Sequence, residues 1–215
     1  MNISEQFLQI GYKWGATLQQ RKFRWVAVFF LCILLIMAGQ MPAFFQYLQQ
    51  RPGLVLNDFL LTVLPARDLS KFIFGLIYFS LAYIILRGVY SPVILLHFLI
   101  GYVVVLAVRV ITLSLSPLEP PLGLVPLTDP GALFFYGGIE VTKDLFFSGH
   151  TATAFLIYLC LQERIEKAVA LAAVIVLAVM LLIQHIHYTI DVLAAVPITY
   201  YCYQLSKRIA AYALG

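Results

Sequence analysis

The sequence predicts an all-α, polytopic membrane protein, a bundle of six transmembrane helices preceded by an interfacial amphipathic helix. The first reason is composition, because 62% of the residues are hydrophobic and 11% are charged, a balance typical of membrane proteins. The second is a series of long apolar stretches separated by prolines, glycines and charges. The third is the placement of basic residues beside those stretches. The net charge of +4 therefore indicates topology and contact with anionic lipids, not nucleic acid.

Residues 1–22 are predicted to form the interfacial amphipathic segment, and residues 23–215 the transmembrane domain. Apolar side chains recur in the first segment at helical spacing, among polar and basic neighbours, which favours a helix lying on the membrane surface. These side chains are Ile3, Phe7, Trp14 and Leu18. A polar tail without regular structure is the alternative.

Six apolar stretches are candidates for transmembrane helices because each approaches the length that crosses a bilayer. They are residues 23–39, 71–87, 92–115, 145–162, 168–186 and 188–205. Between the first two, Pro42, Pro52 and Pro65 interrupt the chain. The apolar run 54–64 lies there and is too short to cross, so we expect a re-entrant or interfacial helix.

Two polar connections complete the outline. Residues 116–147 contain five prolines and predict a long loop outside the membrane that packs over its neighbours. Residues 163–167 are charged and predict a short turn between the fourth and fifth spans.

The basic residues predict that both termini face the cytoplasm, because Lys and Arg gather in cytoplasmic loops. One side of the six-span arrangement collects Lys13, Arg21, Lys22, Arg24, Arg87, Arg164, Lys167, Lys207 and Arg208, and the other only Arg51, Arg67, Lys71 and Lys143. The end of the third span and the starts of the fourth and sixth then meet at the extracytoplasmic face, periplasmic or lumenal. We expect one composite site there.

The start of the sixth span carries His187 and Asp191 four residues apart, hence on one face if the segment is helical. A carboxylate beside an imidazole fixes its tautomer and raises its basicity. An ionisable pair at this depth indicates a functional site, although a histidine inside a membrane also serves to join helices. Between the two, Tyr188 fits an interfacial anchor or cap.

The start of the fourth span carries Ser148, Gly149, His150 and Thr151. Free N–H groups at a helix start attract anions, and glycine lets a phosphate approach closely. His150 can then donate a proton to a leaving oxygen and take one from an acceptor. At the end of the third span, Arg109 offers a planar fork to phosphate, with snorkelling to the interface as the alternative.

These motifs resemble a known family. Asp144-x-x-x-Ser148-Gly149-His150-Thr151 together with His187-Tyr188-Thr189-x-Asp191-Val192 is similar to the paired signature of the sphingomyelin synthase family, within the lipid phosphate phosphatase (type 2 phosphatidate phosphatase) superfamily. Arg109-Val110-Ile111-Thr112 resembles a weaker motif at the end of that family's third span. The resemblance covers roughly residues 60–205.

The resemblance implies that residues 23–215 form a lipid phosphotransferase domain working in two steps. His187 would attack the phosphodiester of a glycerophospholipid and carry the phosphohistidine, oriented by Asp191. His150, supported by Asp144, would protonate the departing diacylglycerol and then activate ceramide, diacylglycerol or water. Glu119 or Glu140 would assist from the loop. The expected substrate contacts are Arg109, Lys143, Ser148, Gly149, Thr151 and Tyr188.

Departures from the superfamily patterns bear on the substrate. Thr142-Lys143 replaces the family's Cys-Gly, and Phe147 stands where the phosphatase branch usually has proline. Met180 and Leu181 replace the Ser-Arg of that branch. The missing arginine favours a phosphodiester over a dianionic monoester, because a dianion needs more cationic contacts.

Other readings stay open: a phosphatase of lipid phosphates or isoprenoid pyrophosphates, and a non-catalytic lipid-binding membrane protein. No cofactor is implied, and no Cys/His or carboxylate cluster indicates a metal. The expected partners are membrane lipids, with a glycerophospholipid as donor and ceramide or diacylglycerol as acceptor. Nucleic acid is not among them. The sequence leaves open whether the chain forms a homo-oligomer.

Overall fold

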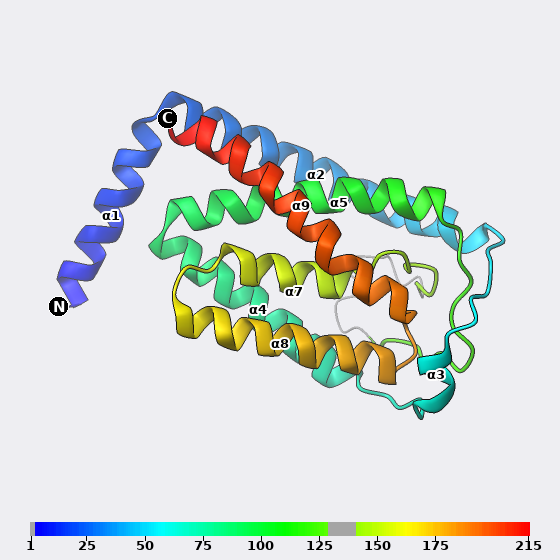
Figure 1. Cartoon of the computed structure of the whole chain (residues 1–215). Coiled ribbons are helices and arrows are strands. Elements are labelled where there is room, and N and C mark those ends of the chain that lie inside the picture. The colour runs from blue at the N-terminus through cyan, green and yellow to red at the C-terminus, as the bar shows by residue number, and fades with distance from the viewer. Residues whose placement is uncertain (1–2, 129–140) are drawn as a thin grey trace.

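The computed structural model describes residues 3–128 and 141–215, and these fold almost entirely as helices (Figure 1). An isolated parallel bridge joins Leu54 to Leu118. The helices are α1 (Ile3–Gln19), α2 (Arg21–Gln50), α3 (Phe59–Val63), α4 (Ser70–Tyr90), α5 (Pro92–Leu115), α7 (Gly149–Cys160), α8 (Arg164–Ile183) and α9 (Thr189–Leu214).

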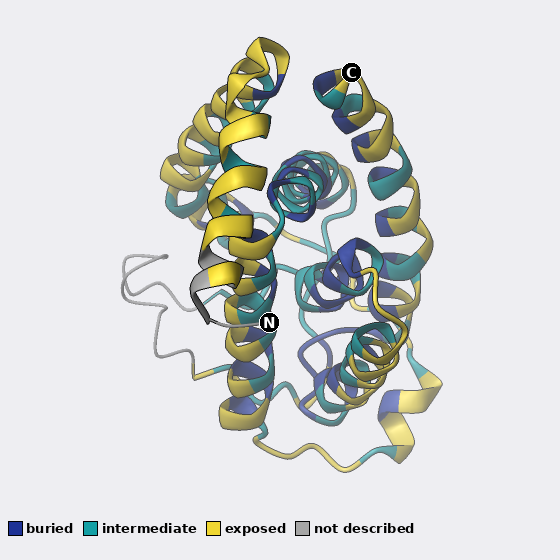
Figure 2. Ribbon diagram, turned by 90° about the vertical axis from the view of Figure 1, so that its left-hand side faces the viewer, coloured by how far each residue is buried: buried dark blue, intermediate teal, exposed yellow. Residues whose placement is uncertain are grey.

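Two helices form the centre of the bundle. α5 packs against α2, α4, α7 and α9, and α7 also packs against α4, α8 and α9. Their inward faces carry fully buried side chains such as Ile100 on α5 and Leu156 on α7, and Figure 2 shows burial concentrated on inward-facing ribbon and exposure on the outer helices. This arrangement places the C-terminal end of α5 beside the N-terminal ends of α7 and α9 (Figure 1).

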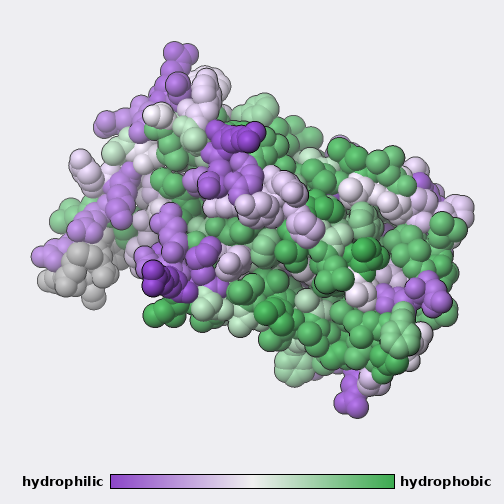
Figure 3. All heavy atoms as spheres, viewed as in Figure 1, coloured by the Kyte–Doolittle hydropathy of each residue, from purple (hydrophilic) through white to green (hydrophobic). Residues whose placement is uncertain are grey.

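Hydrophobic side chains cover much of the middle of the face seen in Figure 3, as expected of a chain surrounded by lipid, and hydrophilic side chains gather mainly toward the end where α1 lies. One side of α4 is buried in the bundle, whereas the other carries large exposed side chains, among them Phe72 at 68% and Phe79 at 70%. Burial in lipid rather than in the protein is the physical reason for such a face. The protein is therefore a membrane protein.

Within the described residues, α2, α4, α5 and α8 are long and apolar enough to cross a membrane. The six expected spans are therefore not confirmed. α7 has 12 residues, or about 18 Å of rise, which is short of the ~30 Å hydrocarbon core. α9 is long enough, with 26 residues, but tyrosines, glutamine and Asp191 lower its hydropathy. Crossing by α7 and α9 stays a prediction.

Several expected boundaries need correction. The first span was expected to end near residue 39, yet α2 continues through Pro42 to Gln50 and ends where Pro52 holds the preceding Arg51 extended. The expected helix over 54–64 is only the five-residue α3. The charged segment 163–167 is not a turn throughout, because α8 begins at Arg164.

The fourth span also differs, since α7 begins at Gly149 and not at residue 145. The preceding backbone is held outside the helix by contacts with neighbouring helices: the Phe147 carbonyl accepts from Arg109 and the Phe146 carbonyl from Thr112. Ser148 then occupies the N-cap position. The third span has the predicted bounds, because the Ser91 hydroxyl caps the helix and Pro92 fits its first turn.

The N-terminal segment is helical, as the spacing indicates. α1 ends at Gln19, and the extended Gln20 separates it from α2. The Trp14 indole donates a 2.8 Å hydrogen bond to the Val89 carbonyl at the end of α4. α1 projects from the bundle in Figure 1. Its position on a membrane surface stays a prediction.

Candidate active site

The two polar motifs meet at one end of the bundle, as predicted from the order of the spans. The Ser148 N–H donates to the Asp191 carbonyl over 3.1 Å, joining the start of α7 to the first turn of α9. The rings of His150 and His187 lie 6.3 Å apart between centroids and are inclined at 67°. The imidazole of His150 on α7 and that of His187, just before α9, therefore lie close together.

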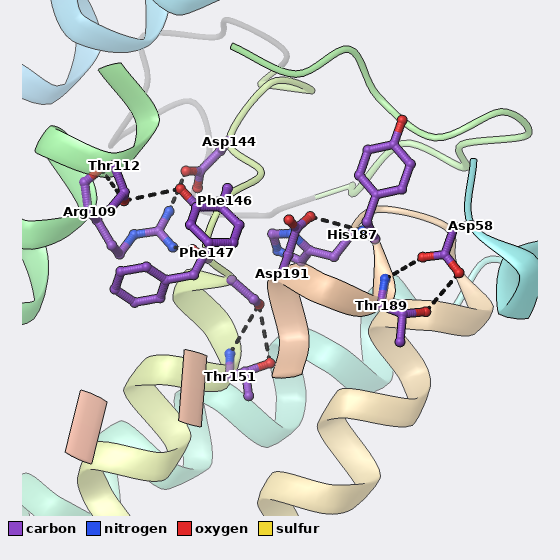
Figure 4. A network of polar contacts seen from close by, with 12 residues as sticks. Asp58, Arg109, Thr112, Asp144, Phe146, Phe147, Thr151, His187, Thr189 and Asp191 are labelled. Carbon is purple, nitrogen blue, oxygen red and sulfur yellow. Dashed lines mark hydrogen bonds and ion pairs between the residues drawn. The ribbon is translucent and has the colours of Figure 1, made fainter. Parts of the chain in front are cut away.

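His187 and Asp191 are in contact, but not for the predicted reason. Asp191 occupies the third position of α9, whereas His187 precedes the helix. The Asp191 carboxylate turns back over the helix start, where Oδ2 accepts from the Tyr188 N–H at 2.9 Å and lies 3.5 Å from His187 Nδ1. A carboxylate facing Nδ1 favours the tautomer protonated there, which leaves Nε2 as the nucleophilic nitrogen. Figure 4 shows both side chains at the end of α9.

Both members of this pair are buried, with 3% of the His187 side chain and none of the Asp191 side chain exposed. His187 Nδ1 and Asp191 Oδ1 are also without a hydrogen-bond partner among the described residues. Burial without full hydrogen bonding costs about 1–3 kcal/mol per group. Such a cost is typical of functional sites.

The start of α7 is built around the buried Ser148 hydroxyl. It accepts from the Thr151 N–H at 3.3 Å and from the Thr151 hydroxyl at 3.2 Å. Gly149 is required by the close approach of Arg109, because a Cβ there would lie 2.7 Å from the guanidinium carbon. A small residue therefore lets the arginine sit directly on the helix start.

Arg109 is 6% exposed and is fixed by two groups of the loop before α7. Its guanidinium donates to the Phe147 carbonyl and forms an ion pair with Asp144 (Figure 4). The Arg109 side chain therefore does not snorkel to the membrane interface. The expected role of Asp144 was support for His150. The structure gives Asp144 a contact with Arg109, and its action on His150 stays a prediction.

Two expected substrate contacts bind protein groups in this structure, and their contact with a substrate stays a prediction. The Lys143 ammonium lies 2.7 Å from a Glu119 oxygen and 2.7 Å from the Arg51 carbonyl. The Tyr188 hydroxyl donates to the Glu119 carbonyl and accepts from the Leu56 N–H. These contacts tie together the loops around the site. Glu119 is engaged in the same network, and Glu140 lies outside the described residues.

Lys143 also changes the acidity of its partner. The ammonium donates to the Glu119 carboxylate, which also accepts from the Gly53 N–H. These hydrogen bonds hold the pKa of Glu119 below its ordinary value. The loop between α5 and α7 is thereby attached to the segment that follows α2.

No sequence pattern points to Asp58, which contacts the N-terminal end of α9. Its carboxylate accepts from the Thr189 N–H at 2.6 Å and the Thr189 hydroxyl at 2.9 Å. The two residues are 131 positions apart, and no periodic pattern joins them. A cavity of about 280 Å³ lies beside this contact. It is lined by Leu56, Asn57, Asp58, Phe59, Tyr188, Thr189, Ile190 and Leu193.

Gln184 and His185, just before His187, were also missed, although each is polar at the end of an apolar helix. Gln184 is fully buried. Its amide nitrogen donates to the Ser70 hydroxyl at 2.8 Å, and its oxygen accepts from the Leu69 N–H at 2.9 Å. The two ring nitrogens of His185 lie 3.2 Å and 3.0 Å from the carbonyl oxygens of Leu122 and Leu64.

Over the part of the chain that is described, no group of three His, Cys, Asp or Glu side chains is arranged to hold a metal ion. The chemistry available to the protein's own residues is nucleophilic attack by one imidazole, proton transfer by the other, and anion binding by Arg109 and the start of α7. Together these are the components of phosphoryl transfer.

Residues 143–208 match a family model described as PAP2 superfamily C-terminal, PAP2_C. The matched segment contains α7, α8 and most of α9, and with them His150, His187 and Asp191. This similarity supports a place in the lipid phosphate phosphatase superfamily and phosphatase-type or phosphotransferase-type chemistry on lipid phosphates. No curated protein matches the chain.

Proposed function

We propose that the protein is an integral membrane enzyme that transfers the phospho-head group of a glycerophospholipid to ceramide, diacylglycerol or water through a phosphohistidine. The observation that carries the proposal is the meeting of His150 and His187, 6.3 Å apart between ring centroids, beside an arginine and a helix start. A phosphorus atom held between the rings is within reach of a nucleophile on one side and an acid on the other.

In the first step His187 Nε2 attacks phosphorus. A nitrogen–phosphorus bond forms, and the bond from phosphorus to the diacylglycerol oxygen breaks. His150 gives its proton to that oxygen, so neutral diacylglycerol leaves. Asp191 stabilises the positive charge that develops on the His187 ring, because its carboxylate faces Nδ1 at 3.5 Å.

In the second step the hydroxyl of the acceptor attacks the same phosphorus. His150, now neutral, takes the hydroxyl proton, and the nitrogen–phosphorus bond to His187 breaks. Throughout, the non-bridging phosphate oxygens lie against the start of α7. Arg109 and the N–H groups after Ser148 stabilise the negative charge that they carry.

The departures in sequence favour a phosphodiester donor. A phosphodiester carries one negative charge on phosphate, and Arg109 is the buried cation at this site. Where the phosphatase branch has a second arginine, this chain has Leu181, which is apolar and fully buried. The site therefore suits a monoanion better than a dianion. The positive-inside distribution of charge supports a site on the extracytoplasmic leaflet, with both termini in the cytoplasm.

A phosphatase acting on phosphatidate or an isoprenoid pyrophosphate is the second candidate, favoured by the match to a phosphatase superfamily. Purified protein distinguishes the two when it is given head-group-labelled phosphatidylethanolamine or phosphatidylcholine, with and without ceramide, and phosphatidate in parallel. We expect diacylglycerol with a phospho-head-group product from the diesters. Inorganic phosphate from phosphatidate, with no product from either diester, contradicts the proposal and supports the phosphatase. A lack of turnover on every lipid supports a non-catalytic lipid-binding protein.

A further inference from the structure

The cavity beside α3 is separate from the pair of histidines, yet it adjoins them through the chain. Tyr188 and Thr189 line it, and these residues directly follow His187. Asp58, which also lines it, binds both the N–H and the hydroxyl of Thr189. Figure 4 shows Asp58 and Thr189 joined next to His187. The wall of the cavity therefore includes the two residues that directly follow His187.

The charged group that lines the cavity is negative. Asp58 contributes a carboxylate, and no Lys or Arg is present among the lining residues. The three hydrogen bonds to this carboxylate come from neutral donors, two on Thr189 and one on the Leu60 N–H. No cation forms an ion pair with Asp58 among the described residues. Asn57 adds a further polar side chain to the same wall. The complementary ligand is a cation that can also donate hydrogen bonds.

The rim of the cavity is apolar. Phe59, Ile190 and Leu193 line it and are 80%, 51% and 62% exposed. Val63 continues the exposed apolar face of α3 at 59%. Exposed apolar groups around one polar group fit a molecule that is itself polar at one end and apolar at the other. A small free amine would leave this rim unused.

We propose that this cavity binds the ammonium head of a phospholipid, with Asp58 as the group that selects a cationic head over a neutral one. This inference rests on the proposed function, because the bound lipid would be the donor whose phosphorus His187 attacks. Binding itself is measurable without turnover. Asp58 is thus a specificity-determining residue and not a catalytic one.

The experiment measures lipid binding to purified, detergent-solubilised protein carrying His187→Ala, so that no lipid is consumed. Dihexanoyl phosphatidylethanolamine and dihexanoyl phosphatidylglycerol are titrated separately, and the rise in unfolding temperature gives each dissociation constant. We expect Asp58→Asn to weaken phosphatidylethanolamine binding about tenfold, or 1.4 kcal/mol, and phosphatidylglycerol binding less than twofold. Equal weakening of both lipids, or of neither, overturns the proposal.

Asp68→Asn is the matched control. Asp68 is a loop carboxylate that caps Ser70 through two hydrogen bonds and does not line the cavity. It should change neither dissociation constant by more than twofold. Free ethanolamine forms a third arm. Binding of ethanolamine as tight as that of the lipid contradicts a lipid site.

A second variant keeps the test decisive if Asp58→Asn fails to fold. Ile190→Trp fills the cavity from its exposed rim and leaves the Asp58 hydrogen bonds in place. We expect at least tenfold weaker phosphatidylethanolamine binding, against no change for Leu205→Trp at an exposed position elsewhere on α9. Unchanged binding by Ile190→Trp overturns the proposal. Because no step requires catalysis, failure of this proposal and failure of phosphotransfer give separate results.

Discussion

Two pairs of polar residues flank Ile186 and are almost equally buried, but they differ in how completely they are bonded. Gln184 and His185, here called the loop clamp, have polar atoms that lie within hydrogen-bond distance of backbone or hydroxyl groups in the α3–α4 loop, in the α5–α7 loop and at the start of α4. His187 and Asp191, the candidate catalytic pair, retain a ring nitrogen and a carboxylate oxygen without hydrogen-bond partners in the described part of the chain.

This difference in hydrogen bonding distinguishes residues that hold the fold together from residues that are available for a reaction, although both kinds lie within a few positions of each other. A buried polar group whose hydrogen bonds are all satisfied contributes to one defined conformation. A buried group that is left partly unsatisfied destabilises the fold unless a ligand or a reaction uses it. We therefore expect changes in the loop clamp to lower stability, and changes in the candidate catalytic pair to lower turnover.

The largest effect is expected from His187→Ala. Removal of the nucleophile should lower head-group release at least about 10³-fold, while the protein still folds and binds detergent-solubilised lipid. Head-group release from labelled phospholipid is the measurement. His97→Ala is the matched control, because His97 lies on α5 and contacts Val93 and Tyr203, away from the site. Full release by the His187→Ala protein contradicts the proposed nucleophile.

Asp191→Asn should lower turnover by about 10²-fold or more. The amide oxygen can still accept from the Tyr188 N–H, so the start of α9 is kept, but the negative charge facing His187 Nδ1 is lost. Turnover and unfolding temperature should be measured on the same preparation. A fall in unfolding temperature with normal turnover would place Asp191 with the loop clamp and remove the distinction between the pairs.

Gln184→Leu should lower the stability of the protein and leave its turnover nearly unchanged. Leucine leaves the Leu69 N–H without its acceptor and removes one hydrogen bond of the Ser70 hydroxyl, which keeps those with Asp68 and the Thr128 N–H. The loss costs about 1–3 kcal/mol of unfolding free energy. Turnover per folded molecule should remain within about threefold of the unmodified protein. Denaturant unfolding in detergent is the measurement, with Gln162→Leu as a control at an exposed position. Loss of activity at unchanged stability contradicts the structural role.

The smallest effect concerns the loop contact between Glu119 and Lys143. Hydrogen bonds from Lys143 and Gly53 lower the pKa of Glu119 below its ordinary value of 4.5. The contact therefore stabilises the fold fully above pH 4.5, and this stabilisation is lost as the pH falls through the lowered pKa. Its size is below about 1 kcal/mol for a partly exposed pair.

Unfolding temperatures of the unmodified and Glu119→Gln proteins should thus differ slightly at pH 6 and converge at pH 3. A difference that grows as the pH falls has the wrong sign for this contact. Lys143→Gln should reproduce the Glu119→Gln profile, because each variant removes the same ion pair.

Much of the helical framework could be predicted because it depends on local pattern. α5 has the predicted bounds, since Ser91, Pro92 and an uninterrupted apolar run define them. The meeting of His150 and His187 also followed from counting alternating spans. The start of α7 could not be predicted, because it depends on Arg109 and Thr112 of another helix binding the carbonyls before Ser148.

The site could be predicted only where its residues form sequence motifs. His187 and Asp191 were found by spacing, although their contact arises from the carboxylate turning back over the helix start and not from one helical face. Asp58 could not be found, because its contact with Thr189 joins segments 131 residues apart. Lys143 and Tyr188 look like substrate contacts in sequence, but their partners lie in loops that only folding brings near.

The most direct test of phosphotransfer is to trap the covalent intermediate. Purified protein is mixed with phosphatidylethanolamine, quenched in base during turnover, digested, and analysed by mass spectrometry for a phosphoethanolamine adduct. We predict the adduct on His187. Sustained turnover with no adduct, or an adduct on His150 in place of His187, would contradict the proposed mechanism.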